Sequence, residues 1–242
     1  MKTKLIDGKL ISSEIRLEIT ADVAKLKNEY NIVPKLCVIL IGDDPASHVY
    51  VRNKQKSAIS AGMYAEDYKF SDNDNTENVI KLIKKLNNDK AVNGILVQLP
   101  LPENFDKDKI INSIDPLKDV DGLHPHNVGL LSLGQPRFIP ATPFGISELL
   151  NRNNIKVEGS NMVIIGRSNI VGIPLANLFV QKNKNFNATV TVCHSRSKNI
   201  SEYTLNADII IAAIGQANYL RSDMVKPGSV IIDVGINRIS DD

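Results

Sequence analysis

Tyr50 and Lys54, in the stretch SHVYVRNKQKSAISAG, are the side chains of this sequence whose types and spacing most directly suggest chemistry. On a helix, positions i and i+4 lie on one face, so a phenol ring and an amine would project together. Such a pair can transfer protons, with the lysine either assisting the tyrosine or acting itself. The spacing alone leaves one alternative open, a half-buried tyrosine beside a solvated lysine.

The order of segments along the chain limits the kind of enzyme that this pair could serve. In short-chain dehydrogenases the Tyr-x-x-x-Lys helix follows a nucleotide-binding segment at the start of the same domain. Here the turn that could bind a nucleotide contains Gly166, more than a hundred residues after Tyr50. Assignment to the short-chain dehydrogenases therefore fails on topology.

The pair follows residues 35–42 (KLCVILIG), an unbroken apolar run typical of a strand buried on both faces of a parallel sheet. We expect a helix to come next, with Ser47 as its cap. Ligands of open α/β sheets bind outside the carboxyl ends of strands. Gln98, at the end of the predicted strand 94–99, and the loop with Asp121 should therefore come to the same edge as the pair.

A second possible site lies at VIIGRSNIVGIP, residues 163–174, between a predicted strand and a predicted helix. At such a turn a phosphate can meet free backbone N–H groups and the positive end of the helix dipole. The sequence of this turn differs from the common dinucleotide-binding pattern Gly-x-Gly-x-x-Gly, because Ser168 and Val171 occupy two of the three glycine positions. Gly166 and Gly172 flank the turn. The alternative is that Gly166 merely ends a strand.

The end of the next predicted strand, residues 188–194, indicates which dinucleotide would bind. NAD sites place Asp or Glu there, whereas NADP sites use arginine and hydroxyl donors. Ser195 and Arg196, with Arg167 from the turn, can donate to a 2′-phosphate. We therefore favour NADP, and the alternative is that Arg196 and Lys198 form only a solvated basic edge.

Strands alternate with helices in both halves of the chain, which predicts right-handed βαβ crossovers and parallel sheets. We expect a two-lobed α/β protein whose second lobe is a Rossmann-like, doubly wound parallel sheet. The predicted divisions are an N-terminal catalytic domain at 1–120, a loop-rich passage at 121–142 and a nucleotide-binding domain at 143–242. Helices are predicted at 12–29 behind Ser12 or Ser13, at 76–87 behind Thr76, and from about Phe144.

The composition, 242 residues with 43% apolar and 23% charged, is that of a globular protein and excludes disordered and fibrous classes. The net charge of +2 gives no reason to expect nucleic acid or a membrane as partner. Because there is no signal peptide h-region, we expect a cytoplasmic protein. We also expect Cys37 and Cys193 to be buried thiols without a disulfide, and no metal at His124 and His126.

Seven segments of the sequence together resemble the bifunctional methylenetetrahydrofolate dehydrogenase/cyclohydrolase family. They span nearly the whole chain in the family's order, and none carries the resemblance alone. The segments are IGDDPASHVYVRNK, GILVQLPLP, DPLKDVDGLHPHNVG, PATPFGISELL, IIGRSNIVGIPLANL, ATVTVCHSRS and the pair ADIIIAAIG and MVKPGSVIIDVGINR.

This resemblance implies a catalytic set made of Lys54, Tyr50, Gln98 and Asp121. Lys54 is then the essential proton-transfer group, and Tyr50 stacks on the folate ring system. Gln98 orients the lysine, while Asp121 holds the amino-pyrimidine edge of the pterin with paired hydrogen bonds. Val97 and Leu99 would complete the substrate site.

The implied reactions are oxidation of methylenetetrahydrofolate to the methenyl form with NADP⁺, followed by hydrolysis to 10-formyltetrahydrofolate. The family also implies a homodimer that binds no nucleic acid. The resemblance also implies a cofactor site, and four of its residues follow from the glycine turn and the strand end as well: Gly166, Arg167, Ser168 and Ser195. Arg196 rests on the residues, whereas Thr142 and Ile236 rest on the resemblance.

Two other functions stay open at this point. One is a folate- and nucleotide-binding protein without catalysis. The other is a related two-lobed NADP dehydrogenase of shikimate type, which would be expected to use a Lys-Asp pair and gives no reason for VQLPLP. Members of the resembled family continue past DVGINR with a Pro-Gly-Gly-Val-Gly-Pro-like segment and a terminal helix, so we expect this sequence, ending at Asp242, to be truncated.

Overall fold

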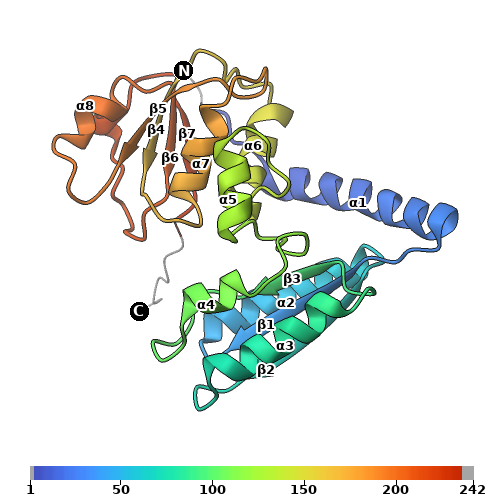
Figure 1. Cartoon of the computed structure of the whole chain (residues 1–242). Coiled ribbons are helices and arrows are strands. Elements are labelled where there is room, and N and C mark those ends of the chain that lie inside the picture. Colours follow the sequence, from blue (N-terminus) through green and yellow to red (C-terminus); the bar gives the residue numbers. More distant parts are fainter. Residues whose placement is uncertain (1–2, 236–242) are drawn as a thin grey trace, which may run out of the picture. The chain divides into compact units, whose positions relative to one another are not determined.

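The computed structural model describes residues 3–235 and divides the chain into two compact units. The first unit runs from Asp7 to Asn127, and the second unit combines the residues before Asp7 with those from Val128 onwards. Each unit contains its own parallel sheet (Figure 1). The two-lobed α/β fold expected from the sequence is therefore confirmed.

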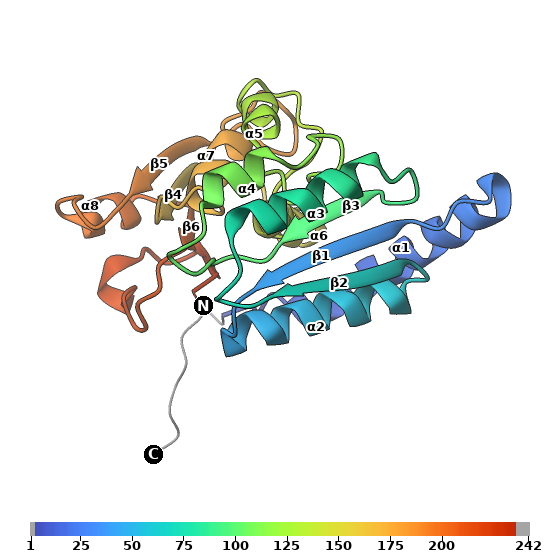
Figure 2. The same cartoon turned by 60° about the horizontal axis from the view of Figure 1, so that its bottom comes forward.

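The first unit is built on a three-stranded parallel sheet with the order β2-β1-β3. Its central strand is fully buried from Cys37 to Ile41, because helices cover both of its faces. Figure 2 shows α2 and α3 on opposite sides of this sheet. The elements are α1 (Gly8–Tyr30), β1 (Lys35–Ile41), α2 (Pro45–Ser60), β2 (Tyr64–Phe70), α3 (Thr76–Asn88), β3 (Gly94–Val97) and α4 (Lys107–Asn112).

The helix starts of the first unit correct the predicted caps. Each of these helices begins after an Asp or Asn whose side-chain oxygen accepts the N–H three residues later, which stabilises the first turn. Ser12, Ser47 and Thr76 are therefore not the caps, although the helices themselves exist. The true caps are Asp7 for α1, Asp44 for α2 and Asn75 for α3.

Lys118 stabilises the carboxyl end of α3 from a distant part of the chain. Its Nζ donates to the carbonyl oxygens of Leu86 at 2.9 Å, Asn87 at 2.7 Å and Asp89 at 2.7 Å. The carbonyl oxygens of Leu86 and Asp89 each accept one backbone N–H as well, from Asp89 at 3.3 Å and from Val92 at 3.1 Å. The ammonium group adds a charged donor at the negative end of the helix dipole. The lysine thereby ties the segment after α4 to α3.

The second unit is built on a four-stranded parallel sheet with the order β5-β4-β6-β7. One core joins the sheet to α5, α6 and α7, and it includes Leu131, Leu150 and Phe179. A smaller core on alternate strand residues joins the other face to α8 and the 3₁₀ turn at Ser222–Met224. The strands are β4 (Asn161–Ile165), β5 (Thr189–Cys193), β6 (Ile209–Ala212) and β7 (Val230–Asp233).

The passage expected at 121–142 is less irregular than predicted. It contains α5 (Pro125–Ser132), and α6 (Ala141–Arg152) begins three residues before Phe144. Pro125 and Gly129 were taken as loop signals, but a proline is well tolerated in the first turn of a helix. The remaining helices are α7 (Gly172–Phe179) and α8 (Ile200–Thr204).

Residues 3–6 belong to the second unit, although the predicted N-terminal domain began at residue 1. Ile6 packs against the core formed by α5, α6 and α7. Residues 3–6 also line a cavity of about 810 Å³ together with Ile155 of the α6–β4 connection and β7. Burial of Ile6 explains why these residues leave the unit that follows them in sequence.

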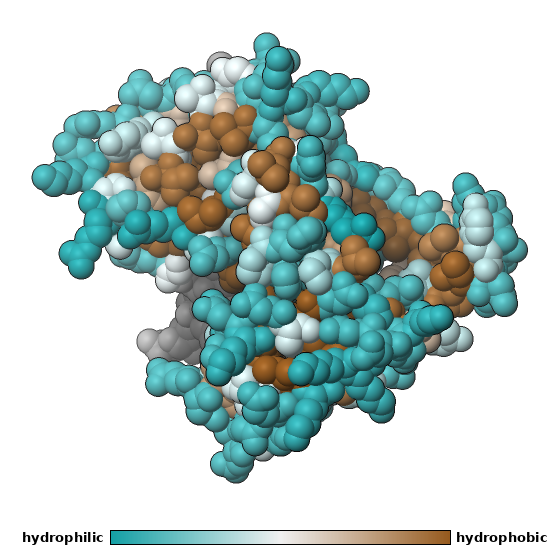
Figure 3. Space-filling model, viewed as in Figure 1, coloured by the Kyte–Doolittle hydropathy of each residue, from teal (hydrophilic) through white to brown (hydrophobic). Residues whose placement is uncertain are grey.

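The surface character of the helices follows from which face each one buries. In α3, Val79, Ile83 and Leu86 are buried, and its lysines lie on the opposite face. Figure 3 shows mainly hydrophilic side chains over this helix. No helix in the described part of the chain is long and apolar enough to cross a membrane.

Replacing Lys118 by methionine tests its role at the end of α3. The substitution keeps the length of the side chain but removes the ammonium donor of three carbonyl oxygens, of which those of Leu86 and Asp89 keep a backbone N–H partner. We expect the free energy of unfolding to fall by about 1–3 kcal/mol, measured by urea denaturation. Lys84→Met on the exposed face of α3 is the matched control and should change stability by less than about 0.5 kcal/mol. Equal effects of the two substitutions would contradict the capping role.

Candidate functional site

Both sheets place a topological switch point beside their first strand. In the first unit the chain moves from β1 to β2 on one side and then to β3 on the other, and in the second unit β4 is flanked by β5 and β6. Loops that leave neighbouring strands in opposite directions open a crevice at the carboxyl edge, where α/β proteins bind ligands. The candidate residues of each unit should therefore gather at these two edges.

In the first unit the structure brings Lys54 and Gln98 together. Lys54 Nζ donates to Gln98 Oε1 at 3.0 Å. The Gln98 side chain is held in turn, because its Nε2 donates to the carbonyl oxygen of Leu99 at 2.7 Å. Gln98 is only 9% exposed, so its amide presents a fixed acceptor to the lysine.

The other predicted substrate residues of this unit differ in whether their side chains or only their backbone is accessible to a ligand. Tyr50 lies one turn before Lys54 on α2 and is 39% exposed, so its ring is accessible to a ligand. Val97 is buried in the core of the first unit, which leaves its backbone as the part that a ligand could reach. Leu99 is partly exposed and precedes Pro100, to which it is joined by a cis peptide bond.

Asp121 is a partly buried carboxylate close enough to Lys54 to interact electrostatically. Burial raises the pKa of the Asp121 carboxyl above its usual value, the Lys54 ammonium opposes this rise, and the Asp119 carboxylate adds to it. The proton affinity of Asp121 therefore depends on two charged neighbours. An amine, an amide and a carboxylate thus lie in one part of the first unit, as the sequence predicted.

In the second unit the turn after β4 is formed by two glycines in close contact. Gly166 has φ of +128°, and a Cβ at this position would lie 2.2 Å from the carbonyl oxygen of Ala213. A Cβ on Gly172 would lie 2.1 Å from the carbonyl oxygen of Gly166. Neither position can hold a larger residue without moving backbone, so the departure from the usual glycine fingerprint still produces a tight strand-to-helix turn.

The polar residues around this turn are available to a cofactor. Arg167 and Ser168 are exposed, and Ser168 Oγ also accepts the N–H of Val171 at 3.2 Å. Ser195 and Arg196 are exposed directly after β5, and the turn 194–198 contains no carboxylate. This set of donors without an acidic residue fits a phosphorylated ribose better than a free one.

A cavity of about 180 Å³ at the carboxyl edge includes Ser168 but also residues that the sequence did not single out. Ala213, Gly215, Val234 and Gly235 line it at the ends of β6 and β7. A sequence pattern for these residues exists, since a glycine follows each strand within three residues and parallel order brings the strand ends together. Thr142 lies exposed in the first turn of α6 and does not line this cavity, and Ile236 lies outside the described residues.

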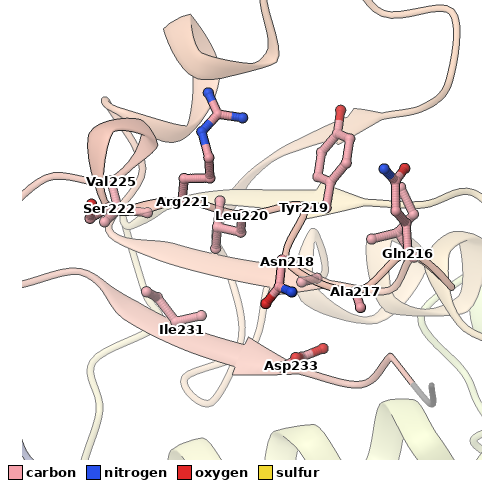
Figure 4. Close-up of a pocket in the computed structure, with 12 residues that line it drawn as sticks. Gln216, Ala217, Asn218, Tyr219, Leu220, Arg221, Ser222, Val225, Ile231 and Asp233 are labelled. Carbon is pink, nitrogen blue, oxygen red and sulfur yellow. The ribbon is translucent and has the colours of Figure 1, made fainter. Parts of the chain in front are cut away.

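A neighbouring cavity of about 410 Å³ contains none of the predicted site residues. It lies between the segment 216–222 and β7, and it shares Ile214 with the smaller cavity. In Figure 4, Asn218 and Asp233 project into this space, whereas Tyr219 and Arg221 point away from β7. Arg221 is paired with Asp223 at 3.2 Å, so its charge is already partnered.

The remaining polar candidates have structural partners. His124 Nδ1 accepts the backbone N–H of His126 at 3.1 Å. No group of three or more His, Cys, Asp or Glu residues within the described chain is arranged to hold a metal ion. Cys37 and Cys193 are buried free thiols in separate units, and burial raises the pKa of Cys37 to about 11.

Together, the fold and the two edges define the class of this protein: a two-domain α/β enzyme with a dinucleotide-binding domain. Two family models match the chain in the same order. The catalytic domain of tetrahydrofolate dehydrogenase/cyclohydrolase matches residues 6–121, and the NAD(P)-binding domain of the same family matches residues 140–242. The chain belongs to the tetrahydrofolate dehydrogenase/cyclohydrolase family.

Individual relatives agree with this assignment. The bifunctional protein FolD of Streptococcus agalactiae is 51% identical over 236 residues, which cover 98% of this chain and 82% of the relative. The crystal structure of the FolD enzyme of Campylobacter jejuni has 47% identity and a TM-score of 0.94, covering 98% of this chain and 83% of that one. The Trypanosoma brucei enzyme, solved with NADP and an inhibitor, has 34% identity and a TM-score of 0.94, covering 100% and 82%.

Family membership confirms the activity expected from the resemblance. The chain is a bifunctional dehydrogenase and cyclohydrolase of one-carbon folate metabolism, and its second unit is the NAD(P)-binding domain. The shikimate-type dehydrogenase is thereby set aside.

Gly166→Ala tests whether the tight turn is needed for cofactor binding. The new Cβ meets the Ala213 backbone and the residue must keep a positive φ, so we expect a loss of more than about 2 kcal/mol in the free energy of unfolding. NADP binding, followed by fluorescence titration of NADPH, should weaken at least tenfold. In Gly129→Ala, the matched control, the added Cβ meets no atom within 4 Å inside α5. This control should bind NADPH normally, and normal binding by Gly166→Ala would contradict the prediction.

Proposed function

We propose that Lys54 is the proton-transfer residue of the cyclohydrolase reaction and that the first unit binds the folate. The observation that supports this most directly is the hydrogen bond from Lys54 Nζ to Gln98 Oε1 at 3.0 Å, beside the partly buried Asp121. Gln98 holds the amine in one position, and a positioned amine can exchange protons with a reacting group within hydrogen-bond reach.

The folate would be held by groups of complementary chemistry. Asp121, when ionised, can accept two N–H groups from the amino-pyrimidine edge of the pterin. The exposed ring of Tyr50 offers a face on which the fused ring system can stack. The backbone of Val97 and the partly exposed Leu99 would border the ligand at the end of β3. These assignments rest on the match of each residue to the family's motifs and on the position of the residues at the carboxyl edge of the first unit's sheet.

The two reactions make different demands on the protein. In the first, a hydride leaves the methylene carbon of methylenetetrahydrofolate and passes to the nicotinamide of NADP⁺, which leaves a methenyl cation. The protein's contribution is to align the two carbons. In the second, water adds to the cationic carbon, the ring opens and one proton is released overall. Lys54 would take the proton from water and return one to the ring nitrogen as the carbon–nitrogen bond breaks.

For the cofactor we propose NADP rather than NAD. Arg196 and Ser195 after β5, with Arg167 from the glycine turn, offer donors for the 2′-phosphate, and the turn 194–198 has no carboxylate to repel it. Gly166 and Ser168 would border the pyrophosphate. Thr142 and Ile236 are assigned from the family pattern alone. The Trypanosoma brucei relative was solved with NADP bound.

The homodimer and the cytoplasmic location implied by the sequence stay predictions. Sedimentation of the purified protein would decide the oligomeric state. Neither prediction affects the assignment of residues to the two sites.

Lys54→Ala tests the proposed mechanism. We expect cyclohydrolase turnover, measured as the loss of methenyl absorbance, to fall at least about 100-fold because the proton-transfer group is gone. NADPH binding should stay unchanged, because the cofactor is bound by the other unit. Lys56→Ala is the matched control, since this exposed lysine lies two residues further on α2 and off the Lys54 face. Full cyclohydrolase activity in Lys54→Ala would remove the lysine mechanism, and a wild-type protein that binds folate without turnover would favour the non-catalytic alternative.

Arg196→Ala tests the choice of cofactor. Loss of a charge-assisted hydrogen bond to the 2′-phosphate should raise KM for NADP⁺ about tenfold or more and leave KM for NAD⁺ within twofold. The dehydrogenase assay with each cofactor measures both values. Lys198→Ala, two residues away on the same exposed edge, should change neither by more than about twofold. An equal rise for the two cofactors would place Arg196 away from the 2′-phosphate.

A further inference from the structure

Asp119 is a buried carboxylate beside the folate site to which the proposed reaction gives no role. It is 1% exposed, and its backbone forms an isolated parallel bridge with Ile95 of β3. A single carboxylate oxygen, Oδ2, accepts the backbone N–H of His124 at 2.8 Å and the side-chain N–H of Asn127 at 2.8 Å. An aspartate buried to this degree needs such partners, because an unpaired carboxylate in the interior is strongly unfavourable.

Asn127 connects Asp119 to a further part of the loop. It is 0% exposed, and its Nδ2 also donates to the carbonyl oxygen of Pro116 at 2.9 Å. Asp119 and Asn127 thus connect three places along the segment 116–127: its start, its middle at His124 and its end in α5. We call this set of hydrogen bonds the Asp119 clasp.

The turn that carries Asp121 lies inside the Asp119 clasp. Gly122 donates its N–H to the carbonyl oxygen of Asp119 at 3.1 Å and has φ of +65°. Val120 is held against β3, since a Cβ on Gly94 would lie 2.6 Å from Val120 Cγ1. The backbone on both sides of Asp121 is therefore held in place, on one side by Val120 and on the other by the hydrogen bond from Gly122 to Asp119.

Asp119 also acts on Asp121 through its charge. The charged groups that act on the Asp121 carboxyl are Lys54 from α2 and Asp119 from its own loop. The nearest imidazole along this loop, His124, has its Nδ1 occupied by the N–H of His126. A negative charge at Asp119 favours the protonated form of Asp121, whereas Lys54 favours the ionised form.

We propose that Asp119 is a positioning residue of the folate site, which fixes Asp121 at the end of β3 through its hydrogen bonds to His124 and Asn127 and through its charge. The proposal rests on the proposed role of Asp121 in folate binding. Asp119 itself does not touch the substrate. It holds the loop that carries Asp121, and its negative charge adds to the effect of burial on that carboxyl.

Asp119→Asn keeps the size of the side chain and one acceptor oxygen but removes the charge. We expect KM for methylenetetrahydrofolate at neutral pH to rise at least fivefold, because the Asp119 clasp is weakened, while KM for NADP⁺ stays within twofold. Folate recognition needs ionised Asp121 and is lost as pH falls through the pKa of that group. Removing the like charge lowers this pKa, so the acid limb of kcat/KM should move to lower pH.

Two further variants separate the clasp from the charge. Asn127→Ser shortens one arm of the clasp and leaves Asp119 charged, so it should raise KM for the folate without moving the acid limb. Asp115→Asn is the matched control, because the Asp115 side chain lies just before the clasp and its Oδ1 accepts the local N–H of Leu117 at 2.9 Å, while the backbone contacts of Asp115 do not change on substitution. This control should leave both quantities within twofold of the wild type.

A carbon-13 NMR titration of the Asp121 carboxyl tests the proposal without any folate. The midpoint should shift to lower pH in Asp119→Asn and stay in place in Asn127→Ser and Asp115→Asn. The proposal is overturned if Asp119→Asn leaves both the midpoint and KM for the folate at their wild-type values. Absence of folate turnover in the wild-type protein would count against the proposed function instead, and the titration would still decide the role of Asp119. Should Asp119→Asn fail to fold, Asn127→Ser decides through KM for the folate.

Discussion

The hydrogen bond between Lys54 and Gln98 joins two side chains that are 44 residues apart, and the first unit has to place β1 and β3 side by side for it to form. Lys54 comes from the helix that leaves β1, and Gln98 is the residue directly after β3. Parallel pairing brings the carboxyl ends of both strands to one edge, and the reversal of strand order at β1 opens that edge to a ligand. The chemistry of the first unit therefore depends on the register of its sheet more than on any local motif.

The second unit meets the same constraint with backbone instead of side chains. Gly166 follows β4 and lies against the Ala213 backbone after β6, so the closest approach again occurs between the ends of two neighbouring parallel strands. Here the absence of a side chain is what permits the close approach, and it leaves backbone N–H groups open to the phosphate that we propose binds there. In the first unit the switch point thus brings polar side chains together, whereas in the second unit it brings backbone segments together without side chains between them.

The sequence predicted the positions of the candidate residues in the fold well where a single strand or helix carries the residue. Continuous apolar runs located β1, β3 and β4, and their order along the chain then placed Lys54, Gln98 and Gly166. Features that depend on contacts between distant segments were not predictable in this way. The roles of Ala213 and Asp119 arise from backbone packing and from a buried carboxylate, neither of which has a local pattern. Helix α5 was missed because proline and glycine have opposite meanings at a helix start and inside a loop.

The packing of residues 3–6 onto the second unit has a consequence for the order of events during synthesis. Residues 3–6 line a cavity together with β7, which is made more than two hundred residues later in synthesis. The first unit can complete its sheet as soon as β3 has emerged, because all three of its strands lie before residue 98. Ile6 therefore has no complete binding place until β7 has been made, so the second unit can finish folding only after the sheet of the first unit is already complete.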